Sequence, residues 1–299
     1  MSRNELSRRA LGRLGLGVAS AALWRGPAFA NTYPTRIAVI DYGLAEALIL
    51  IGLPPIAVMS AEDWKIWVVE PALPPGTADL GASVEPNFER LAALKPDLIL
   101  TTDYVAMAEP TLQRIAPVER LTIHGSADGF EPVPRSVEVT RALGRITGRE
   151  SEAEAAIASF DAELETLGAR LRPRHTRALL FLSFLDPRHV RVYGRKGLYG
   201  NVLTRLGLEN AWEGEVNSWG FATVGVEELV KAGEAECVVI EPVAADIWPA
   251  LARSPLWTHL PFVSEGRVAT MPASLMFGTL PSALRFARLL DKLPEGGSA

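Results

Sequence analysis

Cysteine is almost absent from this 299-residue chain, and histidine is scarce. The single cysteine, Cys237, excludes an intrachain disulfide, and its apolar surroundings in Glu236–Ile240 (ECVVI) favour a buried, unreactive thiol. The four histidines stand far apart, without the close spacing that gathers metal ligands: His124, His175, His189 and His259. We therefore expect no metal site built from the chain's own side chains.

The sequence also lacks the short motifs of common catalytic sites. It contains no G-x-S-x-G, no phosphate-binding loop and no Gly-rich dinucleotide turn. The segment Asp186–His189 (DPRH) holds residue types found in catalysis, but Asp-Pro commonly begins a turn, and we interpret it as one. We expect a protein that is not an enzyme. The alternative is a secreted α/β enzyme such as a hydrolase, which would require a serine, a histidine and an aspartate within hydrogen-bond reach.

Positive charge is sparse once the first thirty residues are set aside. Met1–Ala30 holds five arginines and one glutamate, so its removal takes the formal net charge from −5 to −9. No stripe rich in lysine and arginine remains in the rest of the chain. This distribution argues against a nucleic-acid partner, whose phosphates require such a surface.

The first thirty residues have the pattern of an export signal. Basic residues come first, the apolar run Leu14–Trp24 follows, and Ala28-Phe29-Ala30 offers a small-residue cleavage site. The apolar run is too short to span a bilayer, which takes about 20 residues. Ser7–Leu11 (SRRAL) resembles a twin-arginine export motif, although paired arginines also occur in ordinary signals. We expect an exported protein that does not span the membrane.

A long amphipathic helix is predicted over Ser151–Arg172. Its apolar residues recur every three or four positions and so form one stripe: Ala153, Ile157, Phe160, Leu164, Leu167 and Leu171. Ser151 and Glu154 have the spacing of a capping box, and Pro173 must end the helix. The helix would be about 33 Å long. It is either a surface helix of one domain or a spacer between two lobes, and we prefer the spacer.

Strands alternate with helices on both sides of this helix. The predicted strands are Arg36–Ile40, Ile56–Met59, Asp97–Leu100, Arg120–Ile123, Ala178–Leu185, Val190–Tyr193, Cys237–Ile240 and Val268–Met271. Such alternation is typical of α/β folds with parallel-rich sheets. We predict two α/β lobes, residues 36–150 and 176–295, joined by one long rigid α-helix over residues 151–172.

Aromatic residues gather in the predicted loops and strand ends: Trp64, Trp67, Tyr104, Trp212, Trp219, Phe221 and Phe277. Rings converging from two lobes would wall a cleft for a small ligand. Tyr104 carries the strongest case, because open α/β sheets bind ligands beyond the carboxyl ends of their strands. Any one of these rings could instead belong to the core of its own lobe.

Several motifs resemble those of a known family. Lys95–Leu100 (KPDLIL) followed by a long helix resembles the binding proteins of ABC importers for siderophores, haem and cobalamin. More specific motifs resemble the periplasmic ferric-hydroxamate (ferrichrome-type) siderophore-binding proteins: Trp67–Pro74, Glu85–Asn87, Asp186–His189, Asn210–Trp212 with Gly214, and Asn217–Gly220. The similarity runs from about Arg36 to Leu293. It implies a class III periplasmic binding protein, with a shallow cleft between two lobes and little closure on binding.

The resemblance also implies ligand-binding residues. The family's tyrosine that contacts hydroxamate oxygens falls within one position of Tyr104, and Trp212 and Trp219 align with cleft-facing tryptophans. Met276 and Phe277 stand where the family has a tryptophan and a tyrosine. On this basis the cleft is less aromatic on that side than in the family.

The family's ligand-binding arginine has no counterpart in this chain. Ser83 is the best match for its position, so the cleft lacks one cation. Lys65 and Arg195 are candidates to supply the missing charge, although basic residues in loops are usually just solvated. A ligand that differs from the ferrichrome type is therefore an open alternative: another iron chelate, haem or cobalamin.

We accordingly expect a monomeric solute-binding protein in the periplasm of a Gram-negative-type cell. It would capture a ferric hydroxamate siderophore and deliver it to an ABC permease with its ATPase. Because the iron arrives already chelated, no cofactor and no protein ligand to the metal is expected. The family presents a glutamate from each lobe to the permease; Glu109 and Glu227 (or Glu228) lie near those places, and ordinary surface carboxylates fit them equally well.

Overall fold

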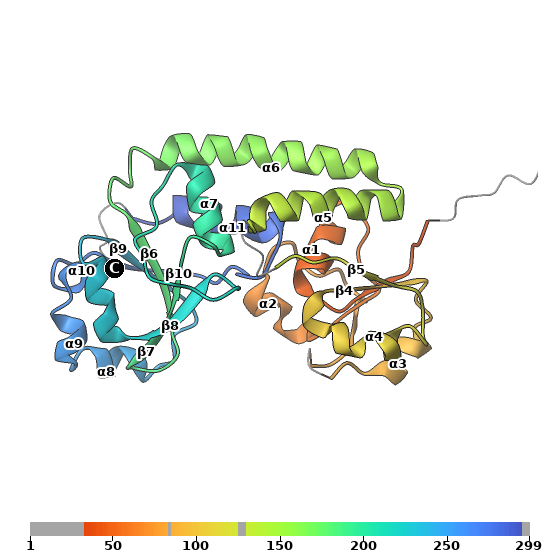
Figure 1. Ribbon diagram of the computed structural model, residues 1–299, viewed down its shortest axis with the longest axis horizontal. Helices are drawn as coiled ribbons and strands as arrows, with labels where there is room; N and C mark the ends of the chain where they lie inside the picture. Colours follow the sequence, from red (N-terminus) through yellow and green to blue (C-terminus); the bar gives the residue numbers. More distant parts are fainter. Residues whose placement is uncertain (1–32, 83–84, 125–129, 295–299) are drawn as a thin grey trace, which may run out of the picture. The chain divides into compact units, whose positions relative to one another are not determined.

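The computed structural model describes residues 33–82, 85–124 and 130–294 (Figure 1). The predicted export signal and Ser83 lie outside the described residues. The chain from Tyr33 onward forms one compact unit, and it contains two five-stranded sheets. We call the sheet before residue 121, with its helices, the first lobe, and the sheet after residue 178, with its helices, the second lobe.

The first lobe is built on a parallel sheet in the spatial order β3-β2-β1-β4-β5. Its strands are β1 (Ile37–Val39), β2 (Ala57–Val58), β3 (Ala78–Asp79), β4 (Leu98–Thr101) and β5 (Val118–Arg120). The central strands β1 and β4 are fully buried, as expected where helices cover both faces of a parallel sheet. Its helices are α1 (Tyr42–Leu50), η1 (Ala61–Asp63), α2 (Trp64–Trp67), α3 (Phe88–Ala93), η2 (Asp103–Ala108), α4 (Glu109–Leu112) and α5 (Pro132–Thr147).

The second lobe is built on a mixed sheet in the order β10-β9-β6-β7-β8. Its strands are β6 (Leu179–Phe184), β7 (His189–Tyr193), β8 (Phe221–Gly225), β9 (Glu236–Ile240) and β10 (Val268–Met271). β10, β9 and β6 run parallel, while β7 pairs antiparallel with both of its neighbours. Its helices are α7 (Leu198–Leu206), η3 (Val226–Ala232), α8 (Ile247–Leu251), α9 (Pro255–Thr258), α10 (Pro261–Ser264) and α11 (Leu280–Asp291).

The predicted strands are confirmed in both lobes, with one shift and two omissions. The strand predicted at Arg120–Ile123 begins two residues earlier and ends three residues earlier, as β5. The short edge strand β3 and the strand β8 were not predicted, because Ala78-Asp79 is too short to show a pattern and β8 follows a Gly- and Trp-rich segment. The turn predicted at Asp186–His189 is confirmed: the Asp186 carboxylate accepts hydrogen bonds from the backbone N–H groups of Arg188 and His189.

The long helix α6 (Glu150–Leu171) runs beside α5 and on to the second lobe (Figure 1). All six residues of the predicted apolar stripe are buried. Ala153 packs in the core of the first lobe, and the other five pack in a core of the second lobe with α7 and α11. The helix therefore contributes to both lobes. The lobe boundaries at residues 150 and 176 remain a prediction.

The predicted capping box at the start of α6 is wrong. The helix begins at Glu150 without a side-chain cap, and only Arg149 separates it from Gly148, which ends α5 in a left-handed conformation. Glu154, the expected capping partner, accepts two hydrogen bonds from the Arg141 guanidinium of α5, at 2.7 and 3.1 Å. The tight α5–α6 connection brings this arginine within reach, and its ion pair replaces the local cap.

Candidate functional site

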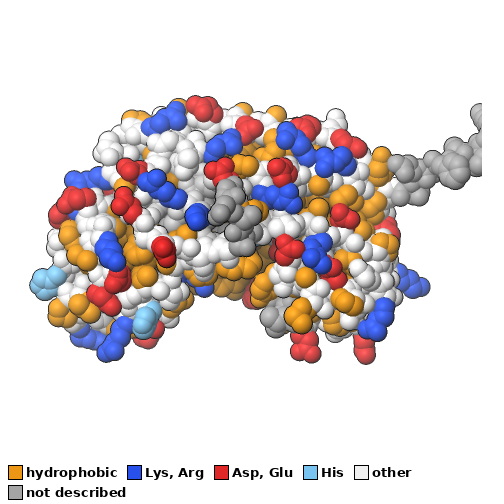
Figure 2. Space-filling view, in the orientation of Figure 1, with side chains coloured by type: hydrophobic (Ala, Val, Ile, Leu, Met, Phe, Trp, Pro, Cys, Tyr) orange, Lys and Arg blue, Asp and Glu red, His pale blue; other side chains and the backbone are white. Residues whose placement is uncertain are grey.

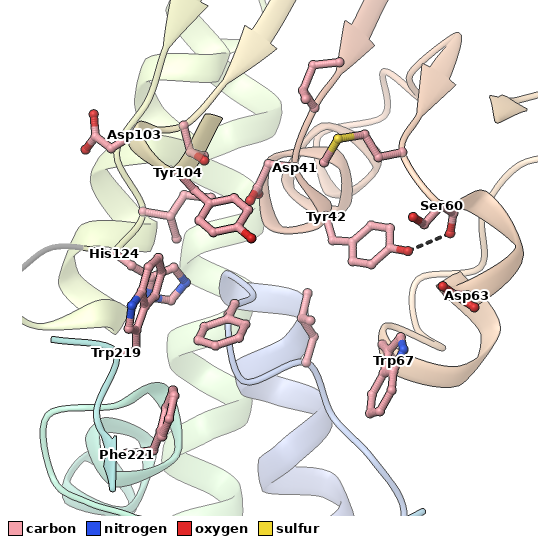
Figure 3. A pocket seen from close by; sticks show the side chains of 16 residues that line it. Asp41, Tyr42, Ser60, Asp63, Trp67, Asp103, Tyr104, His124, Trp219 and Phe221 are labelled. Carbon is pink, nitrogen blue, oxygen red and sulfur yellow. Dashed lines mark hydrogen bonds between the residues drawn. The ribbon is translucent and has the colours of Figure 1, made fainter. Parts of the chain in front are cut away.

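A pocket of about 510 Å³ opens where the two lobes meet (Figure 3). From the first lobe it is lined by residues that follow strands: Ile40, Asp41, Tyr42, Met59, Ser60, Asp63, Trp67, Thr102, Asp103, Tyr104, Ile123 and His124. From the second lobe come Trp219, Phe221, Leu275 and Phe277. The first-lobe segments lie beyond the carboxyl ends of β1, β2, β4 and β5, where open α/β sheets usually bind ligands.

Aromatic rings from separate segments meet on one side of this pocket (Figure 3). Trp219 lies with its ring centroid 5.2 Å from that of Phe277 and 6.1 Å from that of Tyr104, both in edge-to-face geometry. The His124 ring lies 5.8 Å from Trp219 and 5.5 Å from Phe277. Tyr104 is 62% exposed, so most of its surface is available to a ligand.

The loop that carries Trp219 is held by hydrogen bonds to Asn217 and by a close backbone contact with Gly197. The Asn217 side chain accepts a hydrogen bond of 2.9 Å from the Trp219 N–H, and the Gly220 N–H donates to the Asn217 carbonyl. Gly220 has a φ of +80°, and a Cβ there would lie 2.1 Å from the Cα of Gly197, at the start of α7. Only glycine allows this close approach, which fixes the loop against the second lobe.

The other side of the pocket is formed around Tyr42. Its hydroxyl donates a hydrogen bond of 2.6 Å to the Ser60 carbonyl, and its ring packs edge-on against Trp64. Burial, together with the nearby carboxylates of Asp63 and Asp79, raises the pKa of Tyr42 to about 12. This phenol therefore stays neutral at physiological pH, and its hydrogen is already donated to the backbone.

Three carboxylates line the pocket, from Asp41, Asp63 and Asp103. Asp41 caps α1 by accepting from the Leu44 N–H at 2.9 Å, and burial raises its pKa to about 6. Burial lowers the pKa of His124, so its ring is neutral at pH 7. Within the described ranges, no lysine or arginine lines this pocket.

Five of the predicted site residues line the pocket: Trp67, Tyr104, Trp219, Phe221 and Phe277. The two basic candidates do not. Lys65 is exposed outside it, and Arg195 faces Glu209 at 3.8 Å on the surface. Met276 also lies outside the lining, where its sulfur accepts from the Arg191 guanidinium at 3.6 Å.

Trp64 and Trp212 are core residues, so their expected place in the cleft is wrong. Trp64 is 2% exposed and donates to the Pro71 carbonyl at 2.8 Å. Trp212 is 5% exposed in a core of the second lobe. Asn210 explains this, because its side chain donates to the Tyr193 carbonyl and accepts from the Trp212 N–H. These bonds turn the segment toward the sheet and the indole into the core.

Sequence reasoning missed Asp41, Tyr42 and His124. Each follows a strand of the first lobe, so the rule that singled out Tyr104 applies to them too. Asp41 and Tyr42 stand directly after the predicted strand Arg36–Ile40, and His124 directly after Arg120–Ile123. The strand-end position was the available signal.

The glutamates expected to face a permease differ in solvent exposure and in ion pairing. Glu109 is only 9% exposed and accepts hydrogen bonds at both oxygens from the Arg120 guanidinium. This pairing lowers the pKa of Glu109. Glu227 is exposed, and Glu228 pairs with Lys231. Of the expected contacts, only Glu227 is exposed without an ion-pair partner among the described residues.

Metal-binding clusters do not occur in the part of the chain that the structure describes. None of its clusters of histidine, cysteine, aspartate and glutamate could hold a metal ion. Ser60 and His124 lie well apart in the pocket (Figure 3), and the Ser60 hydroxyl donates to the Gly81 carbonyl rather than to a histidine. None of the described helices combines the length and apolar character needed to cross a membrane.

Comparison with known proteins explains this combination of two lobes and an aromatic pocket. The family model described as periplasmic binding protein matches residues 37–275. The chain belongs to the periplasmic binding protein family. The predicted fold class, with two α/β lobes and one long helix, is thereby confirmed.

Two of the similar proteins are named FhuD, and a third is named FecB. The iron(3+)-hydroxamate-binding protein FhuD of Escherichia coli is 30% identical over 263 residues, which cover 88% of each chain. The crystal structure of FhuD from Vibrio cholerae with bound Fe3+-Desferal matches with a TM-score of 0.81 and 27% identity. That match covers 89% of this chain and 99% of the other. The Fe(3+) dicitrate-binding protein FecB of E. coli is 25% identical over 249 residues, covering 81% and 78% of the two chains.

Proposed function

We propose that this protein is a periplasmic solute-binding protein that captures a ferric hydroxamate siderophore in the pocket between its lobes. The observation that carries the proposal is the convergence of Tyr104, Trp219 and Phe277, from both lobes, on one pocket. The similarity to FhuD supports hydroxamate as the ligand class. Similar proteins act as carriers, which also supports a role without catalysis.

Binding would rest on contact with the organic shell of the chelate. The iron is already wrapped in hydroxamate oxygens, so no side chain needs to reach it. The exposed ring of Tyr104 and the partly buried ring of Trp219 offer apolar surface, and each Å² that a ligand buries contributes about 25 cal/mol. The Tyr104 hydroxyl supplies a donor for a ligand oxygen at the rim. This division of roles suits a ligand that is bulky, preformed and largely apolar outside.

Delivery would involve an ABC permease and its ATPase. Glu227 is our candidate contact on the second lobe, since its carboxylate is exposed. Residues 1–30 would act as the export signal, with cleavage after Ala30 and transport by the twin-arginine route. We infer that the released chain works as a monomer.

A fluorescence titration tests the proposed function. Trp219 and Trp67 line the pocket, so ferrichrome should quench tryptophan emission with submicromolar affinity. Iron-free ligand serves as the control for non-specific quenching. Haem, cobalamin and ferric citrate are titrated as competitors. If no ferric hydroxamate binds, or if one of these competitors binds far more tightly, the hydroxamate assignment fails.

A further inference from the structure

We propose that the pocket selects ferric hydroxamates that carry a positive charge, and that Asp63 and Trp67 receive a pendant alkylammonium group. The inference rests on the proposed function and deepens it, because it names the ligand subclass and the residues that choose it.

The pocket lining is acidic on balance. Asp41, Asp63 and Asp103 contribute carboxylates, and the neutral His124 does not offset them. The negative charge of Asp103 is partly compensated by the Arg120 guanidinium, which lies 3.4 Å from its carboxylate. The Thr122 hydroxyl also donates a hydrogen bond of 2.7 Å to the Asp103 carboxylate. The same arginine is also bound to Glu109, so these three charged groups together keep one negative charge.

One arginine lies close to the aromatic side of the pocket without lining it. Arg191 of β7 places its guanidinium carbon 4.3 Å from the centroid of the Phe221 ring. Its terminal nitrogen donates to the Met276 sulfur, and it is not part of the pocket lining. Phe221, which does line the pocket, lies against this guanidinium. A ligand therefore meets an aromatic surface there, and the charged side chains among the described lining residues are all carboxylates.

One corner combines a carboxylate with an exposed indole. Asp63 ends η1, and Trp67 ends the adjoining helix α2, four residues later, so the two side chains share a face. Trp67 is 43% exposed, and Asp63 forms no ion pair with any residue that the structure describes. Lys65, at the intermediate position, is exposed outside the pocket lining.

This corner suits an ammonium group. A carboxylate attracts it through charge, and an indole face adds a cation–π contact. In Figure 3 Asp63 and Trp67 lie across the pocket from Trp219 and His124, with Asp41 and Tyr42 between them. A chelate that packs against the rings of Tyr104, Trp219 and Phe277 would therefore reach this corner with a flexible tail.

The test compares two chelates that differ in one charge. Ferrioxamine B carries a terminal primary ammonium, and its N-acetylated form has the same iron-binding groups without that charge. Isothermal titration of the full protein should show about three- to tenfold tighter binding of the charged form at low salt, with the difference shrinking as ionic strength rises. Asp63→Asn should abolish the difference, and Trp67→Leu should reduce it.

Glu62→Gln is the matched control. It removes the same charge from the neighbouring position of η1, which does not line the pocket, and should preserve the preference. Equal affinities for the two chelates, or a preference that survives in Asp63→Asn, would overturn the inference and leave the proposed function standing. If neither chelate nor ferrichrome binds the unmodified protein, the proposed function fails, and this inference fails with it.

Discussion

The Ser282 hydroxyl donates a hydrogen bond of 2.6 Å to the Glu46 carboxylate, across 236 positions of sequence. The other oxygen of Glu46 accepts from the Thr279 hydroxyl at 3.0 Å and from the Thr279 N–H. Glu46 belongs to α1 of the first lobe, and both partners stand at the start of α11. Leu275 and Phe277, which line the pocket, come just before these partners. This buried contact therefore fixes the position of that wall relative to α1.

The Glu46 contact predicts that stability falls as pH rises. Burial raises the pKa of Glu46 from 4.5 to about 7 in the folded protein. Below pH 4.5 the residue is protonated in both states. Between pH 4.5 and about 7 the unfolded state ionises first, and folding loses up to about 3 kcal/mol. Urea unfolding at pH 5 and pH 7 measures the difference.

The variant Glu46→Gln isolates the contribution of Glu46 to the pH dependence of the free energy of unfolding. The amide keeps the shape of the side chain without the ionisation, so the variant should lose part of the pH dependence between pH 5 and 7. Asp41, whose pKa is raised to about 6, adds a contribution of the same sign, and His124, whose pKa is lowered by burial, adds one of the opposite sign. Glu89→Gln, at an exposed site, should behave like the unmodified protein. An unchanged pH profile in Glu46→Gln would contradict the account.

Replacing Trp219 should lower the affinity for the ligand, whereas replacing Trp212 should lower the stability of the fold. Trp219→Ala removes a ring that contacts Tyr104 and Phe277 at the pocket, so the affinity for ferrichrome should fall about tenfold. Trp212→Ala empties part of a core and should lower the free energy of unfolding by about 3 kcal/mol or more. Its folded fraction should still bind. Titration and denaturant unfolding of both variants give the two values, and a Trp219→Ala protein with normal affinity would remove this ring from the site.

Gly220 should control the placement of Trp219. Gly220→Ala forces a Cβ against the Gly197 backbone, so the loop must move and ligand-induced quenching should weaken. Gly76→Ala is a matched control, because Gly76 also has a positive φ, of +87°, but an added Cβ meets nothing within 4 Å. Both variants carry backbone strain, and only the first should lose affinity. Equal binding by the two variants would show that the loop is not held by this approach.

Substitution of Glu227 should affect transport, and substitution of Glu109 should affect stability. Glu227→Arg reverses an exposed charge and should lower siderophore uptake by whole cells without changing affinity in solution. Glu109→Gln breaks the two-point contact with Arg120 and should lower the melting temperature. Normal uptake by Glu227→Arg would exclude this residue as a permease contact.

The sequence predicts the lobes and most strands because periodicity and strand-end rules depend on local patterns. The buried stripe of α6 is an example, since spacing alone places Ile157 and Leu164 on one face. The failed capping box shows the limit: Glu154 is taken by Arg141, a partner from the preceding helix. Such tertiary contacts leave no mark in the local sequence.

The pocket could be predicted only in part for the same reason. Trp219 and Trp212 both stand in Gly-rich loops, and no local pattern distinguishes them. The hydrogen bonds of Asn210 send Trp212 into the core, while Asn217 and Gly220 present Trp219 to the pocket. The acidic lining depends on residues from several strand ends meeting in space, which the fold alone decides.

Crystals of the protein grown with ferrichrome test the central claim most directly, because iron scatters anomalously and can be located without assumptions. The account predicts one strong iron peak inside the pocket, beside Tyr104 and Trp219, with hydroxamate oxygens as its only ligands. An iron peak outside this pocket, or one bonded to protein side chains, would contradict it.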